Sequence, residues 1–407
     1  MAELLQQTRL TDEMIEDMRS RIGIPLRPRI TWNTSSCYDS VKHYALGIGD
    51  DNPLYVDRAY GKGTALGGNL ASPSFLYSCN PTFVQMGLRG IHGFHAQSDW
   101  RWFRPITQGQ ELKTTIWLDS VEERPSRMGG RSVVTIYASV VANDRDEVLA
   151  HARSTTFRME RGATRERKKE MIEPQRWDEA SLQKLEEQYA QEKVRGAEPR
   201  YWEDVQVGEA IGQIIKGPLC MSDMMAYYAG NMVAPTPAHR LAWKDMQRHP
   251  MWYFRNPENG GLEPIIRVHE NIQAAQSAGV PAPYDVGIQR HAWMVQALTD
   301  WMGDDAFLES NTLEYRAFNY YGDVQTFTGE VSRKFVENGL HKVEVAVRGT
   351  SQRGTVTIPG TAIISLPTRS GPPPVVVVNE TRVLLNDFLA TLPVQPDFSR
   401  QQKDPKR

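Results

Sequence analysis

The chain has 407 residues, enough for two or three domains with a buried core. Its 47 Lys and Arg against 49 Asp and Glu leave a net charge of -2, which argues against a nucleic-acid-binding protein. The longest apolar runs are too short for a transmembrane helix, and the charged N-terminal segment is unlike a secretory signal. Three widely separated cysteines form neither a disulfide framework nor a metal-ligand pattern. We therefore expect a cytoplasmic protein with no metal and no membrane contact.

The first half combines short helices with long strands. Residues 11–22 and 38–49 favour helices, and Pro73 begins a longer apolar helix over residues 74–86, which Pro81 must interrupt. After Trp100 the hydrophobic period changes to two. Three strands are therefore predicted, over residues 112–118, 132–141 and 148–159.

The second half repeats this plan after a charged segment. Residues 161–200 are predicted to be a helical linker, and an apolar helix is expected over residues 288–301. Strands follow over residues 311–317, 326–335, 342–348 and 355–366. Antiparallel strands after a buried helix, twice over, indicate an α+β protein built as a pseudo-repeat. The expected organisation is residues 1–160, the linker 161–200, residues 201–367 with an insertion at 232–264, and a partly disordered tail at 368–407.

Several segments resemble the MaoC-like acyl-CoA hydratases and dehydratases, which have a double hot-dog fold. They are YALGIGDDNPLYVD (residues 44–57), ASPSFL (71–76), WFRP (102–105), YWED (201–204) and RAF (316–318). The resemblance spans roughly residues 30–366. It implies two antiparallel sheets that each wrap a long central helix, and hydration of an enoyl thioester. In such enzymes an Asp and a His hold the reacting water, and the N–H of the glycine that begins the central helix polarises the thioester carbonyl.

The first half lacks two of these three groups. Asp50 fits the family Asp, but Tyr55 stands where the family His belongs. Pro73, eighteen residues later, takes the place of the glycine, and proline has no N–H to donate. The resemblance therefore implies a degenerate half that accommodates the substrate, with Asp50 as a turn or cap residue.

The second half carries the stronger signal. His269 begins HENIQAAQSAG, which resembles the family pattern His-x-Asp-x-x-x-Ala-x-x-x-Gly, and Gly287 lies eighteen residues after it. We therefore expect His269 and Gly287 to be catalytic, with a structural histidine as the alternative. A second alternative is His239, in the loop sequence PTPAH, although no glycine follows at the required spacing.

The family Asp is not found in the second half, because the insertion separates His269 from the preceding helix. Asn231, at the end of that helix, is the expected equivalent, although an amide cannot take up a proton. Asp285 and Glu270 are carboxylates that could substitute, with Glu270 expected to face away. Asp50 could contribute only if the loops of the two halves meet.

Three functions remain open from the sequence. The first is a hydro-lyase that adds or removes water across an enoyl-CoA thioester with a bulky acyl group. The second is an acyl-CoA thioesterase, and the third is a non-catalytic acyl-CoA-binding subunit of a hydratase complex. The thioester is the substrate and no other cofactor is expected. A homodimer or hetero-oligomer is compatible with each, and Arg101, Arg104, Arg290 and Arg316 are candidates to contact CoA phosphates.

Overall fold

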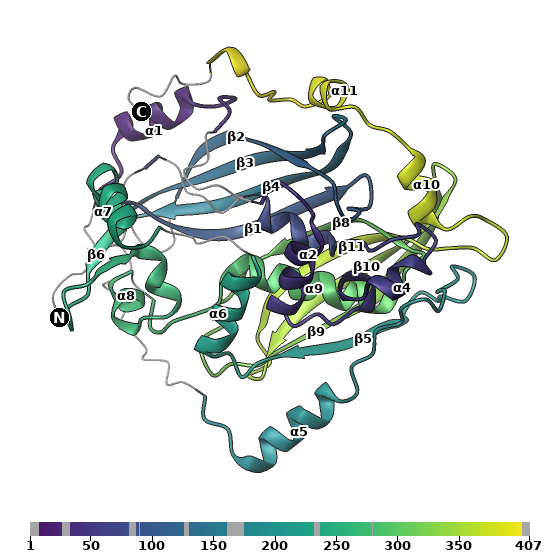
Figure 1. The fold of residues 1–407 in the computed structure, drawn as a ribbon. Coiled ribbons are helices and arrows are strands. Elements are labelled where there is room, and N and C mark those ends of the chain that lie inside the picture. The colour runs from purple at the N-terminus through teal and green to yellow at the C-terminus, as the bar shows by residue number, and fades with distance from the viewer. Residues whose placement is uncertain are drawn as a thin grey trace.

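One antiparallel sheet runs through the whole molecule (Figure 1). The computed structural model describes residues 8–26, 33–80, 87–88, 90–125, 130–160, 175–231, 237–278 and 280–400. The nine strands lie in the order β2-β3-β4-β1-β8-β11-β10-β9-β5. They are β1 (His92–Trp102), β2 (Leu112–Pro125), β3 (Arg131–Asn143), β4 (Val148–Met159), β5 (Ala210–Lys216), β8 (Phe307–Glu314), β9 (Gln325–Glu337), β10 (Leu340–Ser351) and β11 (Val356–Ser365).

The two halves meet at the middle of this sheet. Strand β1 of the first half pairs with β8 of the second, with Ser98 opposite Leu313 and Trp100 opposite Asn311. The two predicted sheets are therefore continuous. The register of β1 with β4 shifts between His95 and Gln97, which leaves a bulge at Ala96 beside the junction.

The long central helix of the second half is α9 (Gly287–Met302). Fifteen of its sixteen residues are buried, as expected for a helix apolar on most sides and wrapped by sheet. It packs against β5, β8, β9 and β10, and it ends where Gly303 adopts a positive φ of 77°. This confirms the helix predicted over residues 288–301.

The first half has no helix of comparable length within the residues described. Only a 3-10 helix, η1 (Pro73–Ser78), follows Pro73, and residues 81–86 of the predicted helix lie outside the described structure. The N-terminal helix α1 (Asp12–Ser20) packs against the sheet instead. Its Ile15 and Met18 form a cluster with Leu118, Val133 and Tyr137. Val133, Tyr137 and Val141 are separated by even numbers of residues along β3, so they lie on one face of the sheet. Val141 belongs to the core around α9, so α1 covers the same face.

The C-terminal segment, predicted to be partly disordered, contains three short helices between residues 374 and 400, and residues 401–407 lie outside the described structure. It forms α10 (Pro374–Glu380), α11 (Leu385–Ala390) and η5 (Phe398–Arg400). Leu389 of α11 packs with Trp117, Ala138 and Val140, which lie on the opposite sheet face from the core. Burial of these apolar side chains holds the tail on the first half.

The remaining helices cover loops and the insertion. They are α2 (Tyr38–Gly47), α3 (Pro53–Val56), α4 (Arg58–Lys62), α5 (Glu179–Tyr189), α6 (Met221–Gly230), α7 (His239–Arg248), η3 (Pro250–Trp252), η4 (Ile265–His269) and α8 (Ile272–Ser277). A short ribbon, β6 (Tyr253–Arg255) with β7 (Leu262–Pro264), lies between η3 and η4. In the predicted linker, Leu185 of α5 packs on Ile215 and Val324. Among the described residues, every helix is too short or too polar to cross a membrane.

Candidate functional site

Helices α2 and α6 pack together where both carry a glycine, and this contact joins the two halves. A Cβ on Gly47 would lie 2.8 Å from the Gly230 Cα, and a Cβ on Gly230 would lie 2.8 Å from the Gly47 Cα. Gly47 and Gly230 are therefore in direct contact where the two helices meet.

Asn231 lies at the end of α6, as expected. Its side chain turns back onto its own helix, where Nδ2 donates to the Tyr227 carbonyl at 2.8 Å. It is 6% exposed, and its carbonyl accepts a hydrogen bond from Asn33 at 3.1 Å. Residues 232–236, which follow Asn231, lie outside the described residues. This geometry gives no support to Asn231 as a replacement for the family Asp.

His269 is the last residue of η4, and its ring has a fixed tautomer. Nδ1 lies 2.9 Å from the Tyr284 carbonyl oxygen. Because a carbonyl can only accept, Nδ1 carries the proton, and the lone pair is on Nε2. Burial lowers the pKa of His269 to about 4, so the imidazole is neutral around pH 7. A neutral ring with its lone pair on Nε2 can take up a proton.

Gly287 is the first residue of α9 and lies eighteen residues after His269 in the sequence. The carbonyl that holds His269 belongs to Tyr284, three residues before Gly287. Within the part of the chain that the structure describes, the Gly287 N–H donates to no acceptor. It therefore lies free at the positive end of the helix dipole, where a developing negative charge is stabilised. A Cβ at this position would lie 3.3 Å from the Tyr315 ring and 3.7 Å from the His95 Cβ.

Asp285 is fully buried and ion-paired. Its Oδ2 lies 2.8 Å from Arg290 Nε and accepts a hydrogen bond from Asn319 at 3.1 Å. Arg290 also donates to the Ala317 carbonyl at 2.7 Å. Burial raises the pKa of Asp285 to about 6, although Arg290 and Asn319 oppose the rise. The pair ties residues 317–319 to the first turn of α9, which is a positioning role for the Gly287 N–H.

Glu270, expected to face away from the site, has a buried side chain in an ion pair. Its side chain is 5% exposed, and its Oε2 lies 3.1 Å from Arg267 Nη1. Burial raises the pKa of this carboxyl, against the attraction of Arg267. The Glu270 carboxylate, next to His269 in the sequence, is therefore paired with Arg267 of η4.

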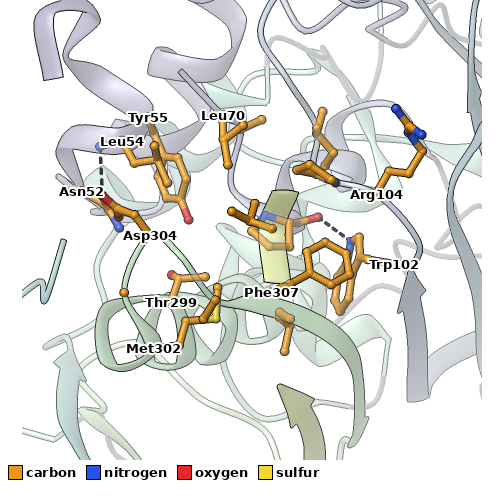
Figure 2. A pocket seen from close by; sticks show the side chains of 18 residues that line it. Asn52, Leu54, Tyr55, Leu70, Trp102, Arg104, Thr299, Met302, Asp304 and Phe307 are labelled. Atoms are coloured by element: carbon orange, nitrogen blue, oxygen red, sulfur yellow. Dashed lines mark hydrogen bonds between the residues drawn. The ribbon is translucent and has the colours of Figure 1, made fainter. Parts of the chain in front are cut away.

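A cavity lies at the far end of α9, lined by residues of both halves, at the position that the first-half site would take (Figure 2). Tyr55 and Pro73, which replace the family His and Gly, both line it. The other lining residues are Asn52, Leu54, Leu70, Ala71, Trp102, Arg104, Pro105, Ile106, Thr299, Met302, Gly303, Asp304, Ala306, Phe307, Leu308 and Val375. Along α9 this cavity is roughly 20 Å from Gly287 at 1.5 Å per residue.

Asp50 lies buried beside this cavity rather than at the His269 site. Its Oδ1 accepts from the Asn52 N–H at 3.0 Å, which is the expected turn role. Burial raises the pKa of Asp50 to about 6 and that of the neighbouring Asp300 to about 8. Pro73 offers no N–H, and its carbonyl accepts from Trp102 at 3.1 Å. This half therefore lacks both the base and the oxyanion donor.

Comparisons with known proteins agree with this architecture. Residues 37–152 match a family model described as the FAS1-like dehydratase domain region. A solved structure described as a MaoC-like dehydratase superposes with a TM-score of 0.60 at 14% identity, covering 86% of this chain and 100% of the other. A Mycobacterium tuberculosis protein with a double hot-dog fold gives 0.52 at 10% identity, covering 87% and 98%. This chain has the double hot-dog fold.

A third relative agrees, and the identities limit what the likeness shows. A MaoC domain dehydratase from Chloroflexus aurantiacus gives a TM-score of 0.54 at 14% identity, covering 88% of this chain and 98% of that one. A search of curated protein sequences found no match. The predicted resemblance to MaoC-like proteins is confirmed. At these identities the solved structures support the fold, and the chemistry must be argued from the residues.

One group in this double hot-dog was missed by sequence analysis. His95 lies on β1 of the first half, and its Cβ is 3.7 Å from the position that a Cβ on Gly287 would take. Its Nε2 is 2.9 Å from the Ser98 hydroxyl, 3.1 Å from the Ser154 hydroxyl and 3.1 Å from the Gln97 carbonyl. The carbonyl requires the proton on Nε2, and burial lowers the pKa of His95 to about 4. Only the β1–β8 junction brings this histidine to the second half, so spacing could not reveal it.

The remaining polar candidates have structural partners. Arg290 pairs with Asp285, and Arg104 is buried and donates to the Thr381 carbonyl at 2.8 Å, so neither lies on an open surface. Arg316 is exposed and paired with Glu314 at 2.9 Å. Among the described residues, no group of three His, Cys, Asp or Glu side chains could hold a metal ion. All three cysteines are free.

Proposed function

We propose that this protein is a hydro-lyase that adds water to, or removes it from, an enoyl thioester. The observation that carries the proposal is the hydrogen bond that holds His269 against the segment that leads into Gly287. A neutral imidazole, protonated on Nδ1, is held by the Tyr284 carbonyl, three residues from a free helix N-terminal N–H. A base and an oxyanion donor in one short segment suit addition to a polarised alkene.

His269 acts as the only proton carrier in this scheme. Water oxygen bonds to the β carbon of the enoyl thioester while one water proton passes to Nε2. The alkene electrons shift onto the thioester oxygen, and the Gly287 N–H stabilises that enolate. The α carbon then takes the proton from Nε2, which restores the neutral ring and yields the 3-hydroxyacyl thioester. The reverse sequence is dehydration, and the thioester bond stays intact throughout.

A single proton carrier follows from the residues available. Asp285 is engaged with Arg290 and Asn319, and Glu270 is paired with Arg267. The first half is not expected to catalyse the reaction, because Tyr55 and Pro73 replace the two essential groups. The substrate is an acyl thioester of CoA or of a protein carrier, and the scheme requires no other cofactor.

The proposal is tested with a panel of enoyl-CoA thioesters, from crotonyl to bulky cyclic acyl groups. Loss of the enoyl absorbance and formation of the 3-hydroxy product are measured for the parent and for His269→Ala. His43→Ala, on the exposed face of α2, is the matched control. We expect hydration by the parent and the control, with a loss in His269→Ala. Release of free CoA without hydration would replace the proposal with a thioesterase, and binding without turnover would replace it with an acyl-binding subunit.

A further inference from the structure

Helix α7 of the insertion is unusually exposed. Of its ten residues only Ala242 is buried. Asp245 is half-buried and accepts a hydrogen bond from the Tyr253 hydroxyl at 2.6 Å, which fixes the helix to the β6–β7 ribbon. The helix lies at one edge of the molecule in Figure 1, and seven of its ten residues are exposed.

Three cations form a stripe along this surface. Arg240, Lys244 and Arg248 are four residues apart, so successive members advance by about 40° around the helix and cover one narrow arc. All three are exposed. No carboxylate among the described residues pairs with any of them, whereas fifteen of the other 24 described arginines have such a partner. This cationic stripe stands on a chain whose net charge is -2.

Large apolar side chains flank the cationic stripe. Leu241 is 61% exposed on one side and Trp243 is 51% exposed on the other. An exposed Trp and Leu beside unpaired cations match the composition of protein interfaces, in which aromatic residues and Arg are enriched. A helix face that contacts only water normally carries polar side chains at such positions.

The exposure of α7 indicates which class of ligand it could bind. Small molecules such as nucleotides are bound in concave sites that bury most of their surface, and a helix ridge offers none. A protein surface can meet a ridge, and the three cations require that surface to be acidic. From α7 the chain passes through η3 and the β6–β7 ribbon into η4, which ends at His269. A partner docked on α7 therefore contacts the same module that carries the proposed base.

We propose that α7 docks an acidic carrier protein that delivers the acyl group as a protein-bound thioester. The inference rests on the proposed function for the identity of the cargo, whereas the docking surface stands on α7 alone. Arg240, Lys244 and Arg248 pair with carboxylates of the carrier, and Leu241 and Trp243 pack on apolar side chains between them.

The test uses the full chain and a bacterial acyl carrier protein bearing a trans-2-octenoyl group. Fluorescence anisotropy of the labelled carrier gives its dissociation constant independently of any turnover. The variant is R240E/K244E/R248E, and the matched control K184E/K193E/R348E makes the same charge change at exposed cations elsewhere. We expect affinity to fall at least about tenfold in the α7 variant and to fall further with added salt in the parent. The control should keep the parent affinity, and thermal melts should be alike in all three proteins.

A second pair of measurements separates this proposal from the proposed function. Turnover of octenoyl-CoA should be unchanged in the α7 variant, while turnover of the carrier-bound octenoyl group falls. If neither substrate is turned over but the carrier still binds through α7, the proposed function fails and the docking surface stands. Equal losses in the α7 and control variants would overturn the proposal, as would absence of carrier binding. It is also overturned if the α7 variant loses affinity for octenoyl-CoA, or if α7 instead binds anionic vesicles or DNA.

Discussion

Replacing Asp285 by Asn should lower the free energy of unfolding rather than selectively abolish catalysis. In Asp285→Asn the Arg290 guanidinium, whose side chain is 4% exposed, loses the carboxylate 2.8 Å away. Removing one partner of a buried ion pair leaves an uncompensated charge and costs about 3–5 kcal/mol. The double variant D285N/R290M removes both charges. It should recover most of this loss, short of about 1 kcal/mol for the Ala317 carbonyl that Arg290 no longer satisfies.

The free energy of unfolding from urea denaturation measures both variants. We expect the midpoint of Asp285→Asn to fall sharply and that of the double variant to return near the parent. Hydration activity at a temperature where each variant is folded should stay close to that of the parent. The reasoning is refuted if Asp285→Asn is as stable as the parent yet inactive, because Asp285 would then be a catalytic group.

Three further outcomes follow from the geometry. Gly287→Pro should lower kcat by about 10²–10³-fold with an unchanged melting temperature, because proline suits the first helical position but removes the N–H, whereas Gly287→Ala should keep most activity. Gly230→Ala should lower the free energy of unfolding by about 1–3 kcal/mol, because its Cβ would lie 2.6 Å from the His43 carbonyl oxygen. An unchanged free energy of unfolding in urea would contradict the close contact between α2 and α6. Burial lowers the pKa of His291 to about 3, that of His95 to about 4 and that of His269 to about 4. The unfolded chain therefore binds more protons below about pH 6.5, so stability should fall as pH drops from 6.5 toward 4. Urea melts across this range would show the loss, and constant stability would contradict neutral buried histidines.

The fold was largely predictable because its signals are local and repeated. The apolar helix over residues 288–301 and the alternating strands of both halves depend on periodicity, which short segments display by themselves. The first-half helix was the least predictable element. Pro81 weakens the pattern, and α1, more than fifty residues earlier in the chain, covers the sheet face that such a helix would occupy. The packing of Leu389 in α11 on Trp117 and Val140 could not be predicted, because these contacts join residues far apart in the sequence.

The site was only partly predictable. Spacing singled out His269 and Gly287, since the family pattern fixes the number of residues between them, and their catalytic roles stay predictions. For Asn231 the fold adds what spacing cannot show, because its side chain turns back onto the Tyr227 carbonyl. Spacing failed for His95, which lies close to Gly287 across the junction of the two halves. Sequence patterns locate groups within one segment, whereas groups from different segments need the fold.

The most direct test of the central claim is the hydration rate of His269→Ala on the enoyl-CoA that the parent turns over fastest, with and without added imidazole. If Nε2 of His269 carries the proton, the rate should fall by about 10²–10⁴-fold, and imidazole should restore part of it while the parent stays unaffected. A variant that hydrates the substrate at the parental rate would contradict the account and move the site away from the second half.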